Sequence, residues 1–461
     1  MKKVLLLAAA LYYTATTFAQ WEQVEQIVQA IGQVPLSEKK VITISAKQAK
    51  DATKAINKAI ADCNKAGGGK VIIPAGEFFT GPIVLLSNVN LHISEGAVLK
   101  FSTNPKDYTP FVLSRWEGMD CYNFKPLIYA YKQTNIAITG TGVLDGQASD
   151  ENWWPWKLGA AEAKAKGIIS QNYNPNHLPG RPKLDSMNDN NVPIEQRMLT
   201  EDHRLRPPFI QPLECTNVLI EGITITNAPF WLIHPTLCEN VTVRKVRMDS
   251  PNGPNNDGCD PESCKNVLIE DCYFNTGDDC IAIKSGRNND GRKWARPSEN
   301  IVIRNCVMKD GHGGVVVGSE ISGDCRNVFA ENCEMDSKNL ERAVRIKSNP
   351  IRGGLIENIY VRNITVGVCK EAILRVEMKY EKVTEGDFMP IVRNVNLENI
   401  TSKSSRYGVY IDGYKGGKTV SNINLKNCEF TGIKEQGLNK IVGAENVTFQ
   451  NSTMTNAESV K

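Results

Sequence analysis

Beyond its first 20 residues, the sequence has no run of about 18 apolar residues, the length that a membrane-spanning helix requires. It also lacks a strong charge of either sign, because 54 Lys and Arg residues against 51 Asp and Glu residues give +3 at pH 7. A balance so close to zero offers no general argument for nucleic-acid binding. We therefore expect no membrane span and no nucleic-acid partner.

The sequence also lacks a zinc-binding pattern, because no CxxC pair occurs with a second such pair. The number of cysteines is 13, an odd number, so at least one thiol cannot form a disulfide within the chain. Four of them hold the same place in successive repeats, where other repeats have Ile or Val: Cys272, Cys306, Cys333 and Cys428. A place shared with Ile and Val points inward. We expect mostly buried thiols, no metal and no cofactor.

Residues 1–19 have the layout of a secretory signal peptide. Lys2 and Lys3 precede an apolar run from Val4 to Leu11, and small or polar residues follow up to Ala19. Removing this segment takes away two lysines and no acid, so the net charge falls to +1. We expect an exported protein, periplasmic or secreted, whose mature part is one domain over 20–461.

From residue 217 onward, a short β-like phrase that opens with Asn recurs nine times. The opening asparagines are spaced 23 to 36 residues apart, at 217, 240, 266, 300, 327, 358, 394, 422 and 446. Repeated strand pairs without helical patterns between them predict a parallel β-solenoid. An Asn at one fixed place in every coil can form a ladder of stacked amides.

Two segments depart from the repeat. The apolar spacing from Asp51 to Lys65 predicts a helix, with Asp51 as its N-cap, that covers the open end of the stacked sheet. The segment from about 150 to 208 interrupts the solenoid with a long polar insertion that begins with three tryptophans, Trp153, Trp154 and Trp156. These rings could stack on sugars or anchor the insertion to the body of the protein, and the sequence favours neither.

Four charged motifs occur in order along the repeats: NNDG over 255–258, GDD over 277–279, GHGG over 311–314 and RIK over 345–347. Asp257 and Asp279 lie 22 residues apart, and steps of 33 residues lead on to His312 and to Arg345. Asp278 and His312 each lie 12 residues after the Asn that opens their phrase. Equal offsets in stacked coils place side chains above one another, so we expect these motifs to form one cluster.

Such a cluster suits the hydrolysis of an acidic sugar polymer. Carboxylates at close range raise the pKa of at least one of them, which leaves a proton donor beside an ionised base. That pair is what glycosidic hydrolysis needs. Arg345 and Lys347, two residues apart on a strand, share a face and can bind a sugar carboxylate.

Taken singly, each motif has an ordinary structural explanation. Gly-Asp-Asp is a common turn, a His in a glycine-rich loop is more often a loop residue, and Arg-x-Lys is most often a solvated strand face. Asp257, Asp260, Asp278 and Asp279 could instead hold calcium, which prefers several oxygen ligands. The order and matching offsets of all four motifs favour the catalytic interpretation.

The order NNDG, GDD, GHGG, RIK resembles glycoside hydrolase family 28, the polygalacturonases and related pectin hydrolases. The resemblance extends from about residue 46 to the C-terminus. It implies a right-handed parallel β-helix and hydrolysis of α-1,4-linked galacturonic acid with inversion. One departure is Asn256, where the family usually has Thr.

The resemblance also implies roles for individual residues. Asp278 resembles the general acid, Asp257 and Asp279 the pair that activates water, and His312 the residue that sets the protonation of the acid. The expected substrate-binding residues are Arg345, Lys347, Tyr380, Asp260 and Asn255.

The insertion is similar to those of exo-acting members, so we expect galacturonate units to be released from the ends of polygalacturonate or pectin chains. The alternatives within the family are an endo-polygalacturonase and a hydrolase of branched pectin, either xylogalacturonan or rhamnogalacturonan. A pectate lyase and a non-catalytic carbohydrate-binding solenoid are the alternatives from other classes. The sequence does not indicate the oligomeric state.

Overall fold

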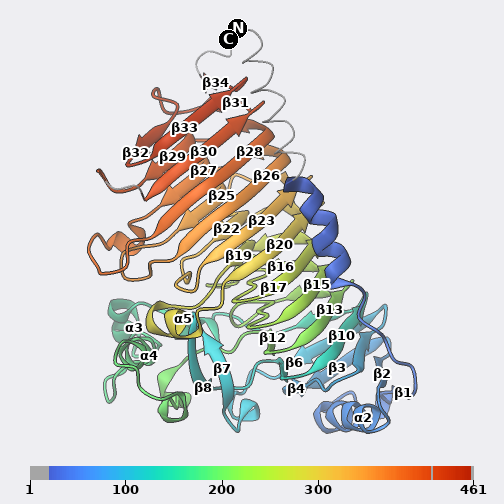
Figure 1. Ribbon diagram of the computed structural model, residues 1–461. Coiled ribbons are helices and arrows are strands. Elements are labelled where there is room, and N and C mark those ends of the chain that lie inside the picture. Colours follow the sequence, from blue (N-terminus) through green and yellow to red (C-terminus); the bar gives the residue numbers. More distant parts are fainter. Residues whose placement is uncertain (1–19, 417–418, 458–461) are drawn as a thin grey trace.

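The computed structural model describes residues 20–416 and 419–457, and the segment 1–19, where we expect a signal peptide, lies outside them. The described chain is a right-handed parallel β-helix (Figure 1), which agrees with the parallel solenoid that the repeat predicts and with the hand that the family resemblance implies. Its coils form three stacks of parallel strands around an apolar interior. No helix within these residues is long and apolar enough to cross a membrane.

The first stack contains the Asn-opened strands of the repeat. Its members, in stacking order, are β1 (Val41–Thr43), β2 (Gly69–Ile73), β5 (Val89–Ile93), β10 (Thr134–Gly140), β13 (Thr216–Glu221), β15 (Glu239–Arg244), β17 (Lys265–Glu270), β20 (Ser298–Arg304), β23 (Cys325–Glu331), β26 (Leu355–Val368), β28 (Ile391–Ser404), β30 (Val420–Lys426) and β33 (Glu445–Gln450).

The second stack follows the first after a short bend. It contains β3 (Gly76–Thr80), β6 (Ala97–Phe101), β11 (Val143–Asp145), β14 (Thr224–Thr226), β16 (Arg247–Ser250), β18 (Tyr273–Thr276), β21 (Val307–Met308), β24 (Glu334–Met335), the second halves of β26 and β28, β31 (Glu429–Ile433) and β34 (Thr453–Asn456).

The third stack completes each coil. It contains β4 (Ile83–Val84), β9 (Ile128–Tyr131), β12 (Ile210–Leu213), single-residue bridges at Ile233 and Cys259, then β19 (Ile281–Ile283), β22 (Val315–Val317), β25 (Arg342–Lys347), β27 (Ala372–Glu377), β29 (Tyr407–Asp412) and β32 (Lys440–Val442).

The predicted asparagine ladder is present. The side-chain amide of Asn240 donates to Asn217 at 3.1 Å, and the same bond repeats in each following coil up to Asn446. These asparagines have φ near +58°, for example Asn266 and Asn327, and Asn tolerates this left-handed conformation better than most residues. The ladder therefore fixes a bend near the start of each Asn-opened strand of the first stack.

The interior confirms the prediction for the cysteines. All 13 are free and buried, and Cys272, Cys306, Cys333 and Cys428 lie in the apolar core beside Ile and Val residues of other coils. The thiols there act as small apolar side chains.

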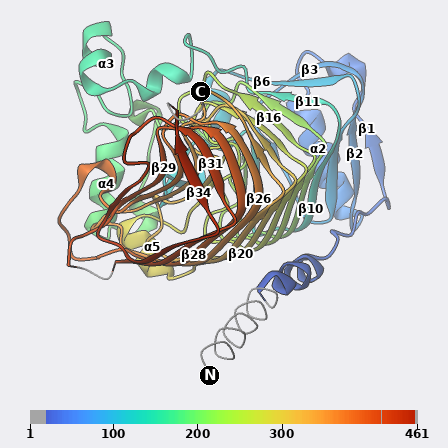
Figure 2. The same ribbon diagram turned by 90° about the horizontal axis from the view of Figure 1, so that it is seen from above.

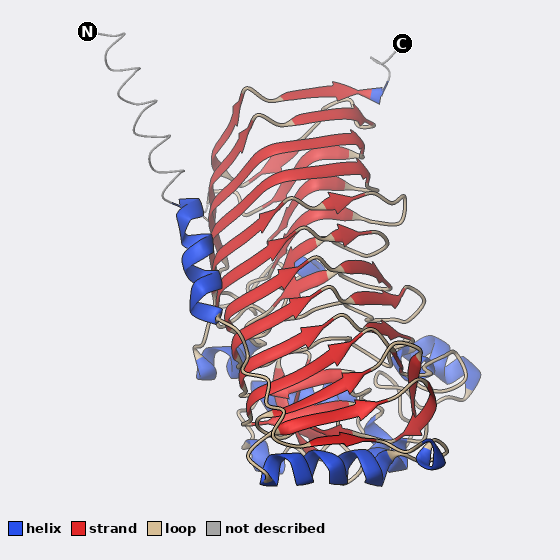
Figure 3. Cartoon of the chain, turned by 90° about the vertical axis from the view of Figure 1, so that its right-hand side faces the viewer, coloured by secondary structure: helices blue, strands red, loops and turns tan. Residues whose placement is uncertain are grey.

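The predicted helix at the open end is α2 (Thr53–Lys65), which lies across the N-terminal end of the solenoid (Figure 3). It buries Ile56, Ala59, Ile60 and Cys63 against the first coils. Its N-cap position is Ala52 and not Asp51 as predicted, although the Asp51 carboxylate still accepts the N–H of Thr53 at 3.1 Å, as an N-cap side chain does. The helix starts at Thr53, one residue later than the predicted N-cap implies.

A second helix, over 20–31, was not anticipated from the sequence. It lies along the outer face of the first stack, where Leu268, Val302 and Phe329 point outward from adjacent coils (Figure 2). Val24 and Ile27 pack onto them. An apolar stripe that would otherwise face solvent is covered in this way.

The insertion lies between β11 and β12 and is folded. It contains α3 (Ala160–Lys166) and α4 (Gly180–Asp189), and α5 (Asn288–Trp294) and the hairpin β7 (Val112–Trp116)–β8 (Met119–Asn123) lie beside it (Figure 1). Trp153 and Trp156 are buried, and the Trp154 indole donates to Ala228 O at 3.0 Å. The tryptophans thus anchor the insertion to the solenoid.

Candidate active site

The third stack aligns two of the motifs directly. Ile281 of β19 pairs with Val315 of β22. Asp278 and His312 each lie three residues before this pair, so they occupy the same place in adjacent coils. Their side chains meet, with His312 Nδ1 at 2.8 Å from Asp278 Oδ1. The equal offsets in the sequence predict this contact, and the structure contains it.

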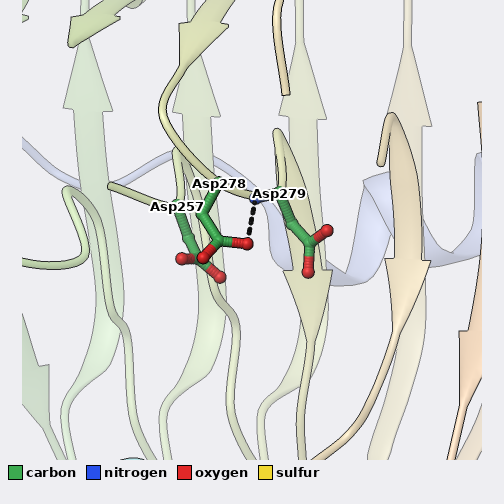
Figure 4. A group of neighbouring side chains, drawn as sticks. All are labelled: Asp257, Asp278 and Asp279. Atoms are coloured by element: carbon green, nitrogen blue, oxygen red, sulfur yellow. Dashed lines mark hydrogen bonds between the residues drawn. The ribbon is translucent and has the colours of Figure 1, made fainter. Parts of the chain in front are cut away.

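The same stack aligns the first two motifs. Cys259 bridges Ile281 of the next coil, and Asp257 and Asp279 each lie two residues before these partners. The carboxylates of Asp257, Asp278 and Asp279 face one space, and their nearest oxygens lie within 4.8 Å of one another (Figure 4). Side chains that are remote in sequence therefore form one acidic cluster.

Asp278 is held in its ionised form. It accepts hydrogen bonds from the N–H of Asp279 at 3.0 Å and from the side chain of Asn255 at 3.3 Å, besides the contact with His312. Burial favours the neutral acid, but the hydrogen bond and charge of His312, with the charge of Lys347, hold the pKa of Asp278 below its ordinary value. The same hydrogen bond raises the pKa of His312.

Asp257 has the opposite balance. It is buried, and burial together with the charges of Asp260 and Asp278 raises its pKa well above the ordinary value. Lys284 opposes this shift from 3.8 Å but also lies 3.7 Å from Asp260 and 3.2 Å from Glu320. One ammonium therefore serves three carboxylates.

Asp260, an expected substrate contact, is fully buried and has no exposed surface. Burial raises its pKa to about 8, although Lys284 opposes the shift. Its side chain faces Lys284 and Asp257 and not the open part of the site. This position suits a group that stores a proton under Asp257.

Asp279 connects the acidic cluster to the RIK motif. Its Oδ2 accepts a hydrogen bond from Lys347 at 2.7 Å, and its Oδ1 lies 4.0 Å from Arg345 Nη1. Arg345 also pairs with Glu377 at 3.1 Å. The predicted cationic pair thus lies directly beside the aspartates, with Arg345 and Lys347 on the outer side of β25.

The remaining expected residues also line this region. Tyr380, in the short 3-10 helix η6 (Tyr380–Lys382), places its ring 5.5 Å from the Arg345 guanidinium and 5.3 Å from the Lys347 ammonium. Asn255 accepts a hydrogen bond from Arg206 while it donates to Asp278. Asn256 is buried and bonds backbone carbonyls and Ser250, so the departure from Thr leaves a structural residue.

The acidic cluster could hold a cation by its oxygen geometry. The protein already supplies positive charge there, because Lys347 contacts Asp279 and Lys284 lies near Asp257. An added divalent cation would have to compete with both ammonium groups. The cluster is therefore a poor match for the calcium alternative, in which carboxylates lack other counter-charges.

A pocket with about 510 Å³ of empty space, including its open mouth, contains Asp257 and Asp278. Its wall on one side is formed by three segments that meet at Arg181 of α4. The guanidinium lies 3.2 Å from Glu117, at the tip of the β7–β8 hairpin, and 3.3 Å from Glu381 of η6. We call Glu117, Arg181 and Glu381 the ion-pair wall.

Several groups of the pocket were not identified from the sequence: Glu117, Lys157, Arg181, Trp231, Lys284, Ser319, Glu320 and Glu381. A signal existed for Lys284. The segment IAIK over 281–284 has the pattern of VRIK over 344–347, and each Lys lies three residues after the aligned positions Ile281 and Val344 of the third stack. The ion-pair wall left no such signal, because its members come from unrelated segments.

Comparison with known proteins supports the family resemblance that the motifs indicate. Residues 195–453 match the model of the family described as glycosyl hydrolases family 28. A solved hyperthermoactive exopolygalacturonase from Thermotoga maritima is 37% identical, with a TM-score of 0.85, and the match covers 94% of this chain and 95% of that chain.

Curated relatives include both modes of attack on the polymer. An exo-poly-alpha-D-galacturonosidase of Dickeya chrysanthemi is 26% identical over 87% of this chain and 68% of its own length. An endo-polygalacturonase of Pectobacterium carotovorum is 27% identical over 82% of this chain and 84% of its own length. Sequence identity at this level does not distinguish exo from endo action. The distinction has to come from the shape of the pocket.

Proposed function

Because the chain belongs to glycosyl hydrolase family 28, we propose that it hydrolyses α-1,4-linked galacturonic acid in polygalacturonate or pectin and releases galacturonate units from chain ends. The observation that carries this proposal is the meeting of an acid–base cluster and a cationic pair in one walled pocket. The substrate is an acidic polysaccharide because Arg345 and Lys347 offer a carboxylate two cationic partners next to the aspartates.

Exo action is supported by the ion-pair wall. Glu117, Arg181 and Glu381 join the hairpin, the insertion and the coil after β27 across one side of the pocket. A polymer chain that passed through on that side would have to break these contacts. A chain end, in contrast, fits a pocket that is closed in one direction.

In the reaction, a proton is added to the glycosidic oxygen while water attacks the anomeric carbon, and the bond between them breaks. We assign proton donation to Asp278. In the free protein the shared proton lies on His312, whose Nδ1 is 2.8 Å from Asp278 Oδ1. A substrate carboxylate placed near Lys347 offsets one of the charges that depress the pKa of Asp278, so binding favours transfer of the proton from His312 to Asp278.

Activation of water is assigned to Asp257 and Asp279. Their Oδ1 atoms are buried and make no hydrogen bond with the described residues, so each can accept one from the same water. Asp257 must be ionised for this role, so the proton that the Asp257–Asp260 pair holds has to lie on Asp260 when water is activated.

Inversion is the stereochemical outcome that the family resemblance implies. The nearest carboxylate oxygens lie closer together than the roughly 6.5–9.5 Å separation common in inverting enzymes. Two carboxylates that hold one water, with a third as the donor, can nevertheless invert. Proton NMR of the first product decides, because inversion of an α-linkage gives the β-anomer.

The test of the function is chromatography of early products from polygalacturonate. The proposal predicts galacturonate as the main early product with a slow fall in viscosity. A rapid fall with mixed oligomers would instead show endo action, and products that absorb ultraviolet light would show a lyase. Release of xylose-bearing or rhamnose-bearing fragments in place of galacturonate would support a hydrolase of branched pectin.

Export is also part of the proposal. The substrate is a polymer outside the cell, and residues 1–19 have the pattern of a cleaved signal. Recovery of a mature protein that begins near residue 20 from the periplasm or medium would support it, and an uncleaved cytoplasmic chain would contradict it.

A further inference from the structure

One cation of the pocket has no partner. Lys157 lines the same pocket as Asp257 and Asp278, and its ammonium forms no hydrogen bond or ion pair with the part of the chain that the structure describes. The other cations there are all paired: Arg181 with Glu117 and Glu381, Lys284 with Glu320, and Lys347 with Asp279. Among the cations of the pocket, Lys157 is thus set apart by its lack of a paired carboxylate within the described residues.

The backbone around Lys157 is firmly held. It is the last residue of the 3-10 helix η3 (Trp154–Lys157), whose neighbours Trp153 and Trp156 are buried. The carbonyl oxygen of Lys157 accepts a hydrogen bond from the side chain of Asn172 at 3.2 Å. An exposed, mobile lysine would not need such anchoring, whereas a lysine that positions a ligand benefits from it.

Lys157 belongs to a short helix, η3, that is attached to the solenoid on the N-terminal side of the aspartates, whereas the RIK motif lies on their C-terminal side. Trp154 bonds Ala228, in the coil that precedes Asp257, while Arg345 belongs to the second coil after Asp279. Adjacent coils are about 4.8 Å apart. A substrate that runs along the axis would therefore meet Lys157 on one side of the aspartates and the RIK pair on the other.

The charges around Lys157 leave room for one more anion. Burial lowers the pKa of its ammonium, and the carboxylates of Glu117 and Asp278 only partly offset this, because Arg206 and Arg181 lie nearby as well. Glu117 is already bound by Arg181 and Arg287, at 3.2 and 3.1 Å. A partly buried ammonium without its own counter-ion gains most from a ligand carboxylate.

We propose that Lys157 binds the carboxylate of the terminal galacturonate unit, while Arg345 and Lys347 bind that of the unit across the cleaved bond. This inference rests on the proposed function and adds the residue that distinguishes an acidic end unit from a neutral one. The enzyme would then require a carboxylate on each side of the bond and not only on one.

The experiment compares the wild type with Lys157→Met, Lys157→Gln and Lys157→Arg, using trigalacturonate as substrate and free D-galacturonate or D-galactose as competing sugars. Wild type should be inhibited more strongly by D-galacturonate than by D-galactose. In Lys157→Met and Lys157→Gln, inhibition by D-galacturonate should weaken by about 10- to 100-fold, the usual range for a hydrogen bond to a charged group. Inhibition by D-galactose should stay within about twofold, because that sugar has no carboxylate to lose.

Lys157→Arg should keep most of the inhibition, since it retains the charge. Lys164→Met is the matched control, because Lys164 lies on the exposed face of α3 in the same insertion. Thermal melts monitored by circular dichroism confirm that each variant is folded.

The outcomes separate the two proposals. If wild type releases no galacturonate from trigalacturonate, the proposed function fails. If wild type releases it, but D-galacturonate inhibits no better than D-galactose, or the folded Gln or Met variant keeps wild-type inhibition, only the role of Lys157 fails.

Discussion

Two pairs of titratable residues at the site, Asp278 with His312 and Asp257 with Asp260, bind protons in opposite ways. Asp278 is partly exposed and has His312 as a cationic partner at 2.8 Å. Asp257 and Asp260 are buried and divide one ammonium, that of Lys284, with Glu320. The pKa falls at Asp278 and rises at Asp257 and Asp260.

The comparison shows that the number of cations per carboxylate decides where protons lie. The His312–Asp278 pair keeps a proton on His312 Nδ1, beside the pocket that contains Asp278, where it can reach a substrate. The Asp257–Asp260 pair keeps a proton between two buried carboxylates, where it reduces their mutual repulsion. On the proposed function, the first pair delivers a proton and the second stores one.

Asp278→Asn breaks the delivering pair and should have the largest effect. An amide cannot donate a proton as an acid does, so kcat should fall by about 10²–10⁴-fold while polygalacturonate still binds. Reducing-sugar release measures turnover, and titration calorimetry measures binding. Asp310→Asn is the control, since Asp310 bonds Ser337 and Asn339 away from the pocket. Turnover within tenfold of wild type would remove Asp278 from the reaction.

His312→Gln weakens the same pair without removing the acid, so a loss of about 10- to 100-fold near neutral pH is expected, below the limit for a full acid. The shared proton then rests on Asp278 alone, whose affinity for it is lower than that of His312. The alkaline limb of the bell-shaped profile of kcat/KM should move to lower pH. An unchanged limb would show that another group controls it.

The His312–Asp278 pair also contributes stability over a defined pH window. The raised pKa of His312 gives stability that is present below its unfolded value near 6.5 and lost as pH rises through the folded value. The lowered pKa of Asp278 gives stability present above its unfolded value near 3.9 and lost as pH falls through the folded value. The Tm deficit of His312→Gln should therefore be greatest between about pH 4 and 6.5.

Asp260→Asn tests the storing pair and should have a smaller effect on turnover. The amide imitates the protonated acid, so we expect kcat within about tenfold of wild type, below the usual contribution of a catalytic acid or base. A loss as large as that of Asp278→Asn would mean that the charge of Asp260 is needed.

The stability of Asp260→Asn sharpens the same test. The folded pKa of Asp260 is about 8, so the folded protein keeps a proton that the unfolded chain releases above about pH 4. Wild-type stability should fall as pH rises between these values, and the variant should lack this fall. Between pH 4 and pH 8, the free energy of unfolding of the variant should rise by about 1 kcal/mol or more relative to that of wild type. This change is the equivalent of about one pKa unit. Thermal melts at both pH values measure the gain.

The sequence predicts the fold and the cluster because both follow from a repeat. Equal offsets from the opening Asn place His312 beside Asp278, and the inward position shared by Cys, Ile and Val identifies the core. The pocket wall could not be predicted in this way. Arg181 meets Glu117 and Glu381 through tertiary contacts between segments 64 and 200 residues apart. The helix over 20–31 was missed because the stripe that it covers is visible only in the stacked sheet.

The sequence also could not predict which aspartates have a raised pKa and which have a lowered one. Three neighbouring aspartates predict that at least one pKa is raised, and this holds for Asp257, but the sequence does not show which of the three it is or that Asp260 shares the shift. Asp260 was expected to contact substrate, and its burial favours a proton-storing role. Burial and the sharing of Lys284 decide this, and neither can be read from spacing.

Removal of divalent cations should have the smallest effect. The three carboxylates lie close enough to hold a cation, but Lys347 and Lys284 already balance them. Activity on polygalacturonate should stay within about twofold in excess chelator, and added calcium should not raise it, because ammonium groups supply the charge that a metal would bring. A loss restored by calcium, with products that absorb ultraviolet light, would show that the lysines do not replace a metal and that the chemistry is elimination. Chelation leaves every side chain in place, so this outcome bears on the charge balance of the site alone. It would overturn the contrast between the Asp278–His312 and Asp257–Asp260 pairs without altering the fold.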